Sequence, residues 1–267
     1  MEKFNRWAAK HAWAAIAIGC VCCFAALSGL AIAQVFPKAL ITPCLVLFAV
    51  IWGVWVLTRA NALLRPSLQK LNTRLDPYPM LEETKTQLDY PGYKHFVVAR
   101  QMNYALALHF TGQHDSAYEQ LASIPIESLP RAQALLKATY YNNLMAVCLA
   151  QDYFAEAETA YENMLRHFGG IKSNTQKASM TYTVETKRAQ LHFCRREYEQ
   201  AIALVDKEPI NPLLQVGNAF FRARIYLAMG DVENAETELE YVVQHGNRLY
   251  YVTEAQALLD KINTEEQ

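Results

Sequence analysis

The sequence predicts an all-α protein, in which an N-terminal two-helix transmembrane hairpin is followed by an α-solenoid of stacked helical hairpins. Three observations support this fold class. The chain of 267 residues begins with two long apolar stretches that carry no charge. Beyond residue 91 the apolar residues recur with the spacing of helices rather than of strands. A short motif recurs four times in that part, which indicates a repeat architecture.

Residues 12–36 and 39–58 form the two apolar stretches, and neither contains Asp, Glu, Lys or Arg. A helix needs about 20 residues to cross the roughly 30 Å of hydrocarbon in a bilayer. Pro37 and Lys38 alone separate the two stretches. We therefore expect residues 1–58 to form a tight transmembrane hairpin, which returns the chain to the side on which it started.

Basic residues flank the hairpin on both sides, whereas its turn carries Lys38 alone. The flanking residues are Lys3, Arg6 and Lys10 before it, and Arg59, Arg65, Lys70 and Arg74 after it. Lys and Arg accumulate on the cytoplasmic side of short loops and span ends. Because no feature points to an organelle, we expect an integral protein of a bacterial plasma membrane, with both termini in the cytoplasm.

Two alternatives concern the first stretch. Residues 1–34 also resemble a secretory signal peptide with a cleavage site at residues 31–33, and Cys20 invites a lipoprotein interpretation. The apolar run is far longer than the usual signal core of about 7–15 residues, and it continues well past Cys20. In either case the second stretch and its basic flank would still place the rest of the chain in the cytoplasm.

Small residues recur every four positions along the first stretch, which lets membrane helices approach closely. They are Ala15, Gly19 and Cys23, followed by Ala25, Gly29 and Ala33. The simplest use of this pattern is packing against the second stretch. The alternative is a homo-oligomer, or another membrane partner, held through the transmembrane helices.

Charge divides the chain into two parts. Residues 1–75 hold eight basic residues and one acid, a net charge of +7, whereas the remaining residues hold 17 bases and 25 acids, a net charge of −8. The basic part suits an anionic bilayer surface. The acidic part gives no electrostatic reason to bind nucleic acid. Within residues 59–92 we expect a basic juxtamembrane helix up to residue 75, then a linker that begins at the prolines of residues 76–79.

The repeated motif occupies residues 112–117, 152–157, 196–201 and 230–235, and each copy ends in an alanine. The alanines lie 40, 44 and 34 residues apart. Each copy lies between two apolar-periodic segments, so each predicts the turn of a helical hairpin. Twelve residues before the turn alanine, Ala105, Ala189 and Ala223 supply a small side chain.

This pattern resembles the tetratricopeptide repeat (TPR), a helix–turn–helix unit in which the small residue lets two antiparallel helices pack closely. The family also places a large apolar residue four positions after the turn alanine, as Leu121, Tyr161, Val205 and Leu239 do here. Met145 departs from the pattern where a small residue is expected, and Arg196 stands in place of the turn glycine. The resemblance implies a TPR-like solenoid over residues 93–267, closed by a capping helix at residues 250–262.

The sequence contains no pattern typical of an enzyme. It lacks zinc-protease, nucleophile-elbow, phosphate-loop and dinucleotide signatures, and its seven histidines and six cysteines show no metal-ligand spacing. We therefore expect no catalytic residue, no cofactor and no metal. An enzyme ranks third among the functional hypotheses.

Binding is the expected function, because the first helices of successive repeats in a solenoid line a groove that suits a peptide or a partner helix. The repeat register predicts that this groove presents Met102, His109, Asn142, Thr183, Thr186, Gln190, Phe220 and Arg224. The sequence thus favours a membrane-anchored TPR-like scaffold for a protein or peptide partner. The alternative is an accessory subunit of a membrane transport or envelope-assembly complex, with the hairpin as its main contact.

Overall fold

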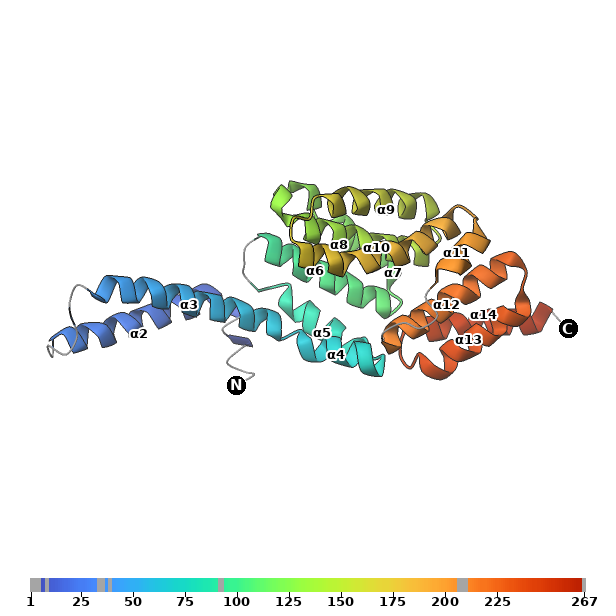
Figure 1. Ribbon diagram of the computed structural model, residues 1–267. Coiled ribbons are helices and arrows are strands. Elements are labelled where there is room, and N and C mark those ends of the chain that lie inside the picture. The colour runs from blue at the N-terminus through green and yellow to red at the C-terminus, as the bar shows by residue number, and fades with distance from the viewer. Residues whose placement is uncertain are drawn as a thin grey trace. The chain divides into compact units, whose positions relative to one another are not determined.

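The computed structural model describes residues 6–7, 10–32, 37, 40–90, 94–205 and 211–265, and the described residues form helices and no strand (Figure 1). The prediction of an all-α protein is therefore confirmed. The chain divides into two compact units, which comprise residues 1–66 with 86–93, and residues 67–85 with 94–267.

The first unit contains an antiparallel helical hairpin made of α2 (Ala12–Ile32) and α3 (Ile41–Ala62). The Trp52 Nε1–H donates a hydrogen bond to the Ala15 carbonyl at 2.9 Å. Gly19 lies directly against the same indole, since a Cβ atom there would come within 2.4 Å of Trp52 Nε1. A residue without a side chain is thus what allows α3 to approach α2.

Large apolar side chains of the hairpin point away from it. Ten of them are between 44% and 82% exposed: Ile18, Val21, Phe24, Leu30, Ile32, Leu40, Val46, Leu47, Val50 and Ile51. Within the described residues, no helix is both long enough and apolar enough to cross a membrane. The transmembrane assignment of the hairpin stays a prediction.

The small residues predicted to pack in the membrane fall into two groups. Ala15 is buried and Cys23 is partly buried, and both line a hollow with Trp52. Ala25 and Gly29 are exposed, and a Cβ atom at Gly29 would meet nothing within 4 Å. The first group therefore serves the contact with α3 and the second does not. Ala33 lies outside the described residues.

The segment after the hairpin is more helical than the sequence predicted. The helix α3 ends at Ala62, α4 covers Arg65–Arg74, and α5 covers Tyr78–Gln87, where a linker was expected. The carboxylate of Asp76 accepts the backbone N–H of Tyr78 at 3.3 Å and so caps α5. The prediction of a linker was wrong because proline does not break a helix in its first turn. Pro79 lies in the first turn of α5, where the N–H that proline lacks would have no hydrogen-bond partner.

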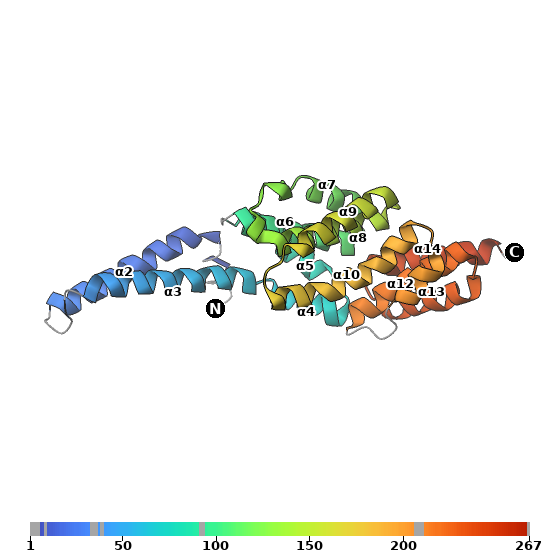
Figure 2. The same ribbon diagram turned by 45° about the horizontal axis from the view of Figure 1, so that its top comes forward.

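Four helical hairpins follow in the second unit, and α14 (Tyr250–Glu265) comes after the fourth (Figures 1 and 2). The hairpins are α6 (Lys94–Phe110) with α7 (His114–Ala122), α8 (Ala134–Ala150) with α9 (Phe154–Gly169), α10 (Asn174–Cys194) with α11 (Tyr198–Leu204), and α12 (Pro212–Met229) with α13 (Val232–His245). Two 3-10 turns, η2 (Ile126–Ser128) and η3 (Arg131–Gln133), join the first hairpin to the second.

The turns of the four hairpins share one backbone conformation. The residue five positions before each turn alanine has a positive φ: 81° at Gly112, 56° at Asp152, 61° at Arg196 and 78° at Gly230. Glycine adopts this left-handed region without steric cost, whereas Asp and Arg do not. The repeat register read from the sequence therefore coincides with a repeat in geometry.

Packing follows the same register. The four turn alanines are fully buried, and Ala105, Ala189, Ala223 and Met145 are at most 1% exposed. A small residue thus lies in the interior of three first helices, while the second hairpin accommodates a methionine. The second helix of the first hairpin, α7, ends at Ala122, three residues before Pro125.

The beginning of the second unit contacts the turn between α13 and α14. The Asn247 side-chain amide donates to the Arg74 carbonyl at 2.6 Å, and the Arg248 backbone N–H donates to the Leu75 carbonyl at 3.3 Å. The Arg248 guanidinium pairs with Asp76 at 3.3 Å and lies 4.0 Å from the centre of the Tyr78 ring. The two hydrogen-bonded side-chain contacts join residues 173 and 172 positions apart.

Candidate functional site

A cavity of about 290 Å³ opens between α6, α8, α10, α12 and α14. We call it the inner cavity. Four of these five elements are the first helices of successive hairpins, which is the arrangement that the repeat register predicted for a groove. Its lining residues are Leu106, His109, Phe110, Asn142, Asn143, Ala146, Tyr182, Thr183, Thr186, Lys187, Gln190, Leu213, Leu214, Gly217, Asn218 and Tyr251.

Five of the eight residues predicted for the groove line the inner cavity: His109, Asn142, Thr183, Thr186 and Gln190. They come from α6, α8 and α10, three helices that are separate in the sequence. The structure therefore brings these side chains together around one space.

The other three predicted groove residues lie elsewhere. Met102 is 2% exposed and belongs to the hydrophobic core, and Phe220 is 4% exposed and packs against Tyr251. Arg224 points to the turn between α8 and α9, where it donates to the Leu149 carbonyl at 3.0 Å and pairs with Asp152. The repeat register assigns a residue to a helix face, but it does not tell which part of that face a neighbouring helix covers.

The helix α14 is the part of the site that the sequence did not predict. It was expected to cover the last hairpin, and it does contact α12 and α13. It also reaches the first hairpin, because the Tyr250 ring lies 5.0 Å from the ring of His109 and 4.5 Å from that of His114. Glu254 lies 3.5 Å from His114 Nε2. The helix α14 thus closes one side of the inner cavity, with Tyr251 in its wall.

Lys187 is the cation of the inner cavity, and the groove prediction missed it. It lies one helical turn after Thr183 on α10, so the spacing of Thr183, Thr186 and Gln190 could have indicated it. Its Nζ donates to Gln190 Oε1 at 2.7 Å. Burial lowers the pKa of Lys187 to about 8, because desolvation disfavours the charged amine.

Two other titratable groups in the cavity wall, His109 and Tyr251, are neutral near pH 7. Burial, and then the charges of His114 and Lys187, hold the pKa of His109 well below its usual value. Burial raises the pKa of Tyr251 to about 12, so its hydroxyl keeps its proton. No Asp or Glu is among the described lining residues, so the net charge of the lining is positive when Lys187 is protonated. The part of the chain that forms the cavity is acidic as a whole.

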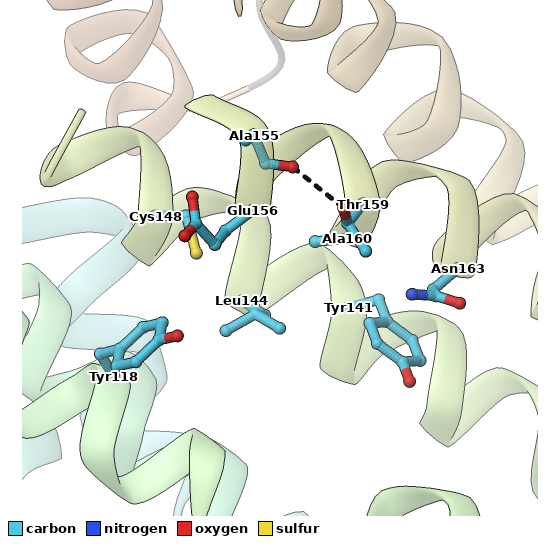
Figure 3. Close-up of a pocket in the computed structure, with 9 residues that line it drawn as sticks. All are labelled: Tyr118, Tyr141, Leu144, Cys148, Ala155, Glu156, Thr159, Ala160 and Asn163. Carbon is cyan, nitrogen blue, oxygen red and sulfur yellow. Dashed lines mark hydrogen bonds between the residues drawn. The ribbon is translucent and has the colours of Figure 1, made fainter. Parts of the chain in front are cut away.

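A second cavity, the side cavity, measures about 360 Å³ and lies between α7, α8 and α9 (Figure 3). In this view Cys148, Glu156 and Tyr118 lie toward one end, and Tyr141 and Asn163 toward the other. Burial, and then the negative charge of Glu156, raise the pKa of the Cys148 thiol to about 12. The reactive form of cysteine is the thiolate, so Cys148 is not placed to act as a nucleophile.

Comparison with protein-family models, curated proteins and solved structures finds no match for this chain. Among the described residues, no group of three or more His, Cys, Asp or Glu side chains could hold a metal ion. The inner cavity is therefore characterised by its own residues: amides, hydroxyls and one amine, set among apolar side chains. Such a lining suits non-covalent binding.

Proposed function

We propose that the protein is a membrane-anchored, TPR-like scaffold that binds a protein or peptide partner at the cytoplasmic surface of the membrane and performs no catalysis. The observation that carries this proposal is the inner cavity, where predicted groove residues from α6, α8 and α10 converge. Helical hairpin repeats generally present such a surface to a partner segment.

The membrane part of the proposal rests on the hairpin. Its exposed apolar side chains, such as Val21 and Val46, would lie in water unless lipid or protein covers them. The uncharged run that contains α2 continues in the sequence to residue 36, beyond the described end of this helix at Ile32. A basic flank on each side of the hairpin supports cytoplasmic termini.

Topology and partner capture are tested separately. A reporter fused to the C-terminus, or labelling of a cysteine introduced there, should show a cytoplasmic location, and an external C-terminus would contradict the topology.

Partner capture is tested by photo-crosslinking. A crosslinking residue at Thr186, in the inner cavity, is compared with one at exposed Thr175 on the same helix. We expect a discrete crosslinked protein from position 186 alone, and identical products from both positions would contradict groove binding.

One observation favours the alternative of an accessory subunit in a membrane transport or envelope-assembly complex. Ala25 and Gly29 are exposed on α2 and do not serve its contact with α3. Small residues four positions apart permit close packing of a further membrane helix, including that of a second copy. Replacing the hairpin with an unrelated two-span anchor separates the hypotheses. Retained partner capture supports the scaffold, and its loss with the second unit still folded supports the complex subunit.

A further inference from the structure

The amine of Lys187 lies at the inner cavity without an acidic partner. It makes no ion pair among the described residues, and its one hydrogen bond goes to the neutral amide of Gln190. A partly buried charge is stable only when hydrogen bonds or an opposite charge compensate its desolvation. A single amide oxygen does this incompletely, so the cavity favours an anion beside Lys187.

A second polar group at the cavity lacks a partner. Asn142 Oδ1 is buried and accepts no hydrogen bond, while Asn142 Nδ2 donates to Asn143 Oδ1 at 3.2 Å. Buried polar atoms in folded proteins are nearly always hydrogen-bonded, so an orphaned atom calls for a partner. A carbonyl oxygen needs a donor, and the site therefore also favours an N–H or O–H group.

The remaining wall and the size of the cavity limit the ligand further. Leu106, Phe110, Leu213 and Leu214 supply apolar contacts. The volume of about 290 Å³ lies near the lower end of the roughly 300–1,000 Å³ that is typical of small-molecule pockets. A molecule the size of one capped amino acid has the right scale.

We propose that the inner cavity binds a small organic acid that carries a carboxylate for Lys187, a neighbouring N–H or O–H donor for Asn142 and an apolar side chain. An N-acylated amino acid or a 2-hydroxy acid with an apolar side chain has this chemistry, and so does the last residue of a peptide. The proposal does not depend on the membrane location of the hairpin or on capture of a protein partner.

The inference predicts a distinctive pH dependence. A carboxylate ligand needs the protonated amine, so its affinity falls about tenfold per pH unit above the pKa of Lys187. Two titratable groups of the cavity wall with shifted pKa values, His109 and Tyr251, do not change charge near the pKa of Lys187, and Tyr182 is a further titratable side chain of the wall. His109 on α6 is already neutral, α8 contributes Asn142 and Asn143, and Tyr251 on α14 titrates far higher, under the opposed influences of Glu254 and Arg224. Cys194, later on α10, weakly raises the pKa of Lys187.

The test uses the full-length protein in detergent micelles and titration calorimetry. The probes are N-acetyl-L-leucine and its neutral amide, followed by a short peptide that ends in leucine, with either a free or an amidated C-terminus. We expect either free acid to bind at pH 7 at least ten times more tightly than its amide. If both free acids bind, a free molecule the size of a metabolite is enough to occupy the cavity. If only the peptide with a free C-terminus binds, the ligand is the terminus of a peptide.

Variants locate the binding. Lys187→Met should weaken acid binding at least tenfold and remove its pH dependence, whereas Lys187→Arg should retain part of the affinity. Exposed Lys177 on the same helix supplies the matched control, Lys177→Met. Because Lys187→Met removes an uncompensated charge, it should not lower the Tm of the ligand-free protein. Equal binding of acid and amide, no binding of any probe, or undiminished binding by Lys187→Met would each overturn the proposal.

Discussion

At the scale of single residues, the turns of the helical hairpins show how one backbone angle limits the choice of side chain. Asp152 and Arg196 adopt the same left-handed conformation as Gly112 and Gly230, although each carries a Cβ atom. At this position the carboxylate of Asp152 forms an ion pair with Arg224, which offsets part of the steric cost. Arg196 has no comparable contact among the described residues.

We therefore expect Arg196→Gly to raise the free energy of unfolding by about 1 kcal/mol, since it relieves left-handed strain. Gly230→Ala should lower it by a similar amount. A Cβ atom at Gly230 would meet nothing within 4 Å, so this change reports the backbone conformation alone. Urea denaturation followed by circular dichroism measures both. Shifts of the same sign in the two variants would contradict the account.

The small residues inside the hairpins give a second prediction. Ala223 is fully buried, and Ala223→Leu should cost about 1–3 kcal/mol through overpacking. Met145 occupies the equivalent position of the second hairpin, and Met145→Leu should cost less than about 1.5 kcal/mol because the two side chains have similar volumes. Thermal unfolding compares the variants. Equal and negligible shifts would mean that the repeat register does not govern the packing.

At the scale of elements, Glu127 holds the connection between the first two hairpins in place. Its carboxylate accepts hydrogen bonds from Tyr141 at 2.8 Å and Lys137 at 3.2 Å, and it lies 2.9 Å from His167 Nε2. Burial by itself would raise the pKa of Glu127, but hydrogen bonds from His167, Tyr141 and Lys137 outweigh it and lower the pKa to about 2. The turn η2 is thereby attached to both α8 and α9.

The lowered pKa of Glu127 determines how its contribution to the free energy of unfolding changes with pH. The native state binds the Glu127 proton more weakly than the unfolded state, so the carboxylate stabilises the fold above pH 4.5 and loses this contribution as the pH falls toward 2. Glu127→Gln should lower the free energy of unfolding at pH 6, and its difference from the wild type should shrink between pH 4.5 and 2. Exposed Glu119→Gln is the control, measured by denaturation at each pH.

Much of this element structure could be predicted from the sequence. Apolar periodicity and the turn motifs located the four helical hairpins and a further C-terminal helix. One element, and one contact of a predicted element, escaped prediction for physical reasons. The helix α5 was hidden by prolines that a first helical turn tolerates. The second role of α14, contact with His109 and His114, depends on how far successive hairpins rotate, and no local pattern encodes that rotation. For the same reason the repeat register could not show that Met102, predicted for the groove, lies in the hydrophobic core. Lys187, in contrast, lies within the helical spacing of Thr183, Thr186 and Gln190, and that spacing could have indicated it.

At the scale of the whole molecule, the contact between residues 74–78 and the turn that precedes α14 joins the two ends of the second unit. The Arg248 side chain is 55% exposed, so its ion pair with Asp76 contributes little, while stacking on Tyr78 adds about 0.5–1 kcal/mol. Arg248→Ala should therefore destabilise the unit only slightly. It should nevertheless speed hydrogen exchange of the residue-248 amide, which donates to the Leu75 carbonyl.

Hydrogen exchange with mass spectrometry checks this prediction, and Arg131→Ala, at an exposed position in η3, serves as the control. Faster exchange confined to residues 74–78 and 246–250 would show that the contact opens by itself. Unchanged exchange there in Arg248→Ala would mean that the two backbone segments remain together without the side chain.

The same contact has a consequence for biosynthesis. The Arg74 and Leu75 carbonyls leave the ribosome long before Asn247 and Arg248, the residues that will hydrogen-bond to them, have been translated. Until then each hairpin can form from its neighbours, because most of its contacts are local, but this end of the unit stays open. Emergence of residues 247–248 from the ribosome is therefore the event that lets this contact form. A nascent chain arrested before residue 247 should expose residues 74–78 to protease, and the finished chain should protect them.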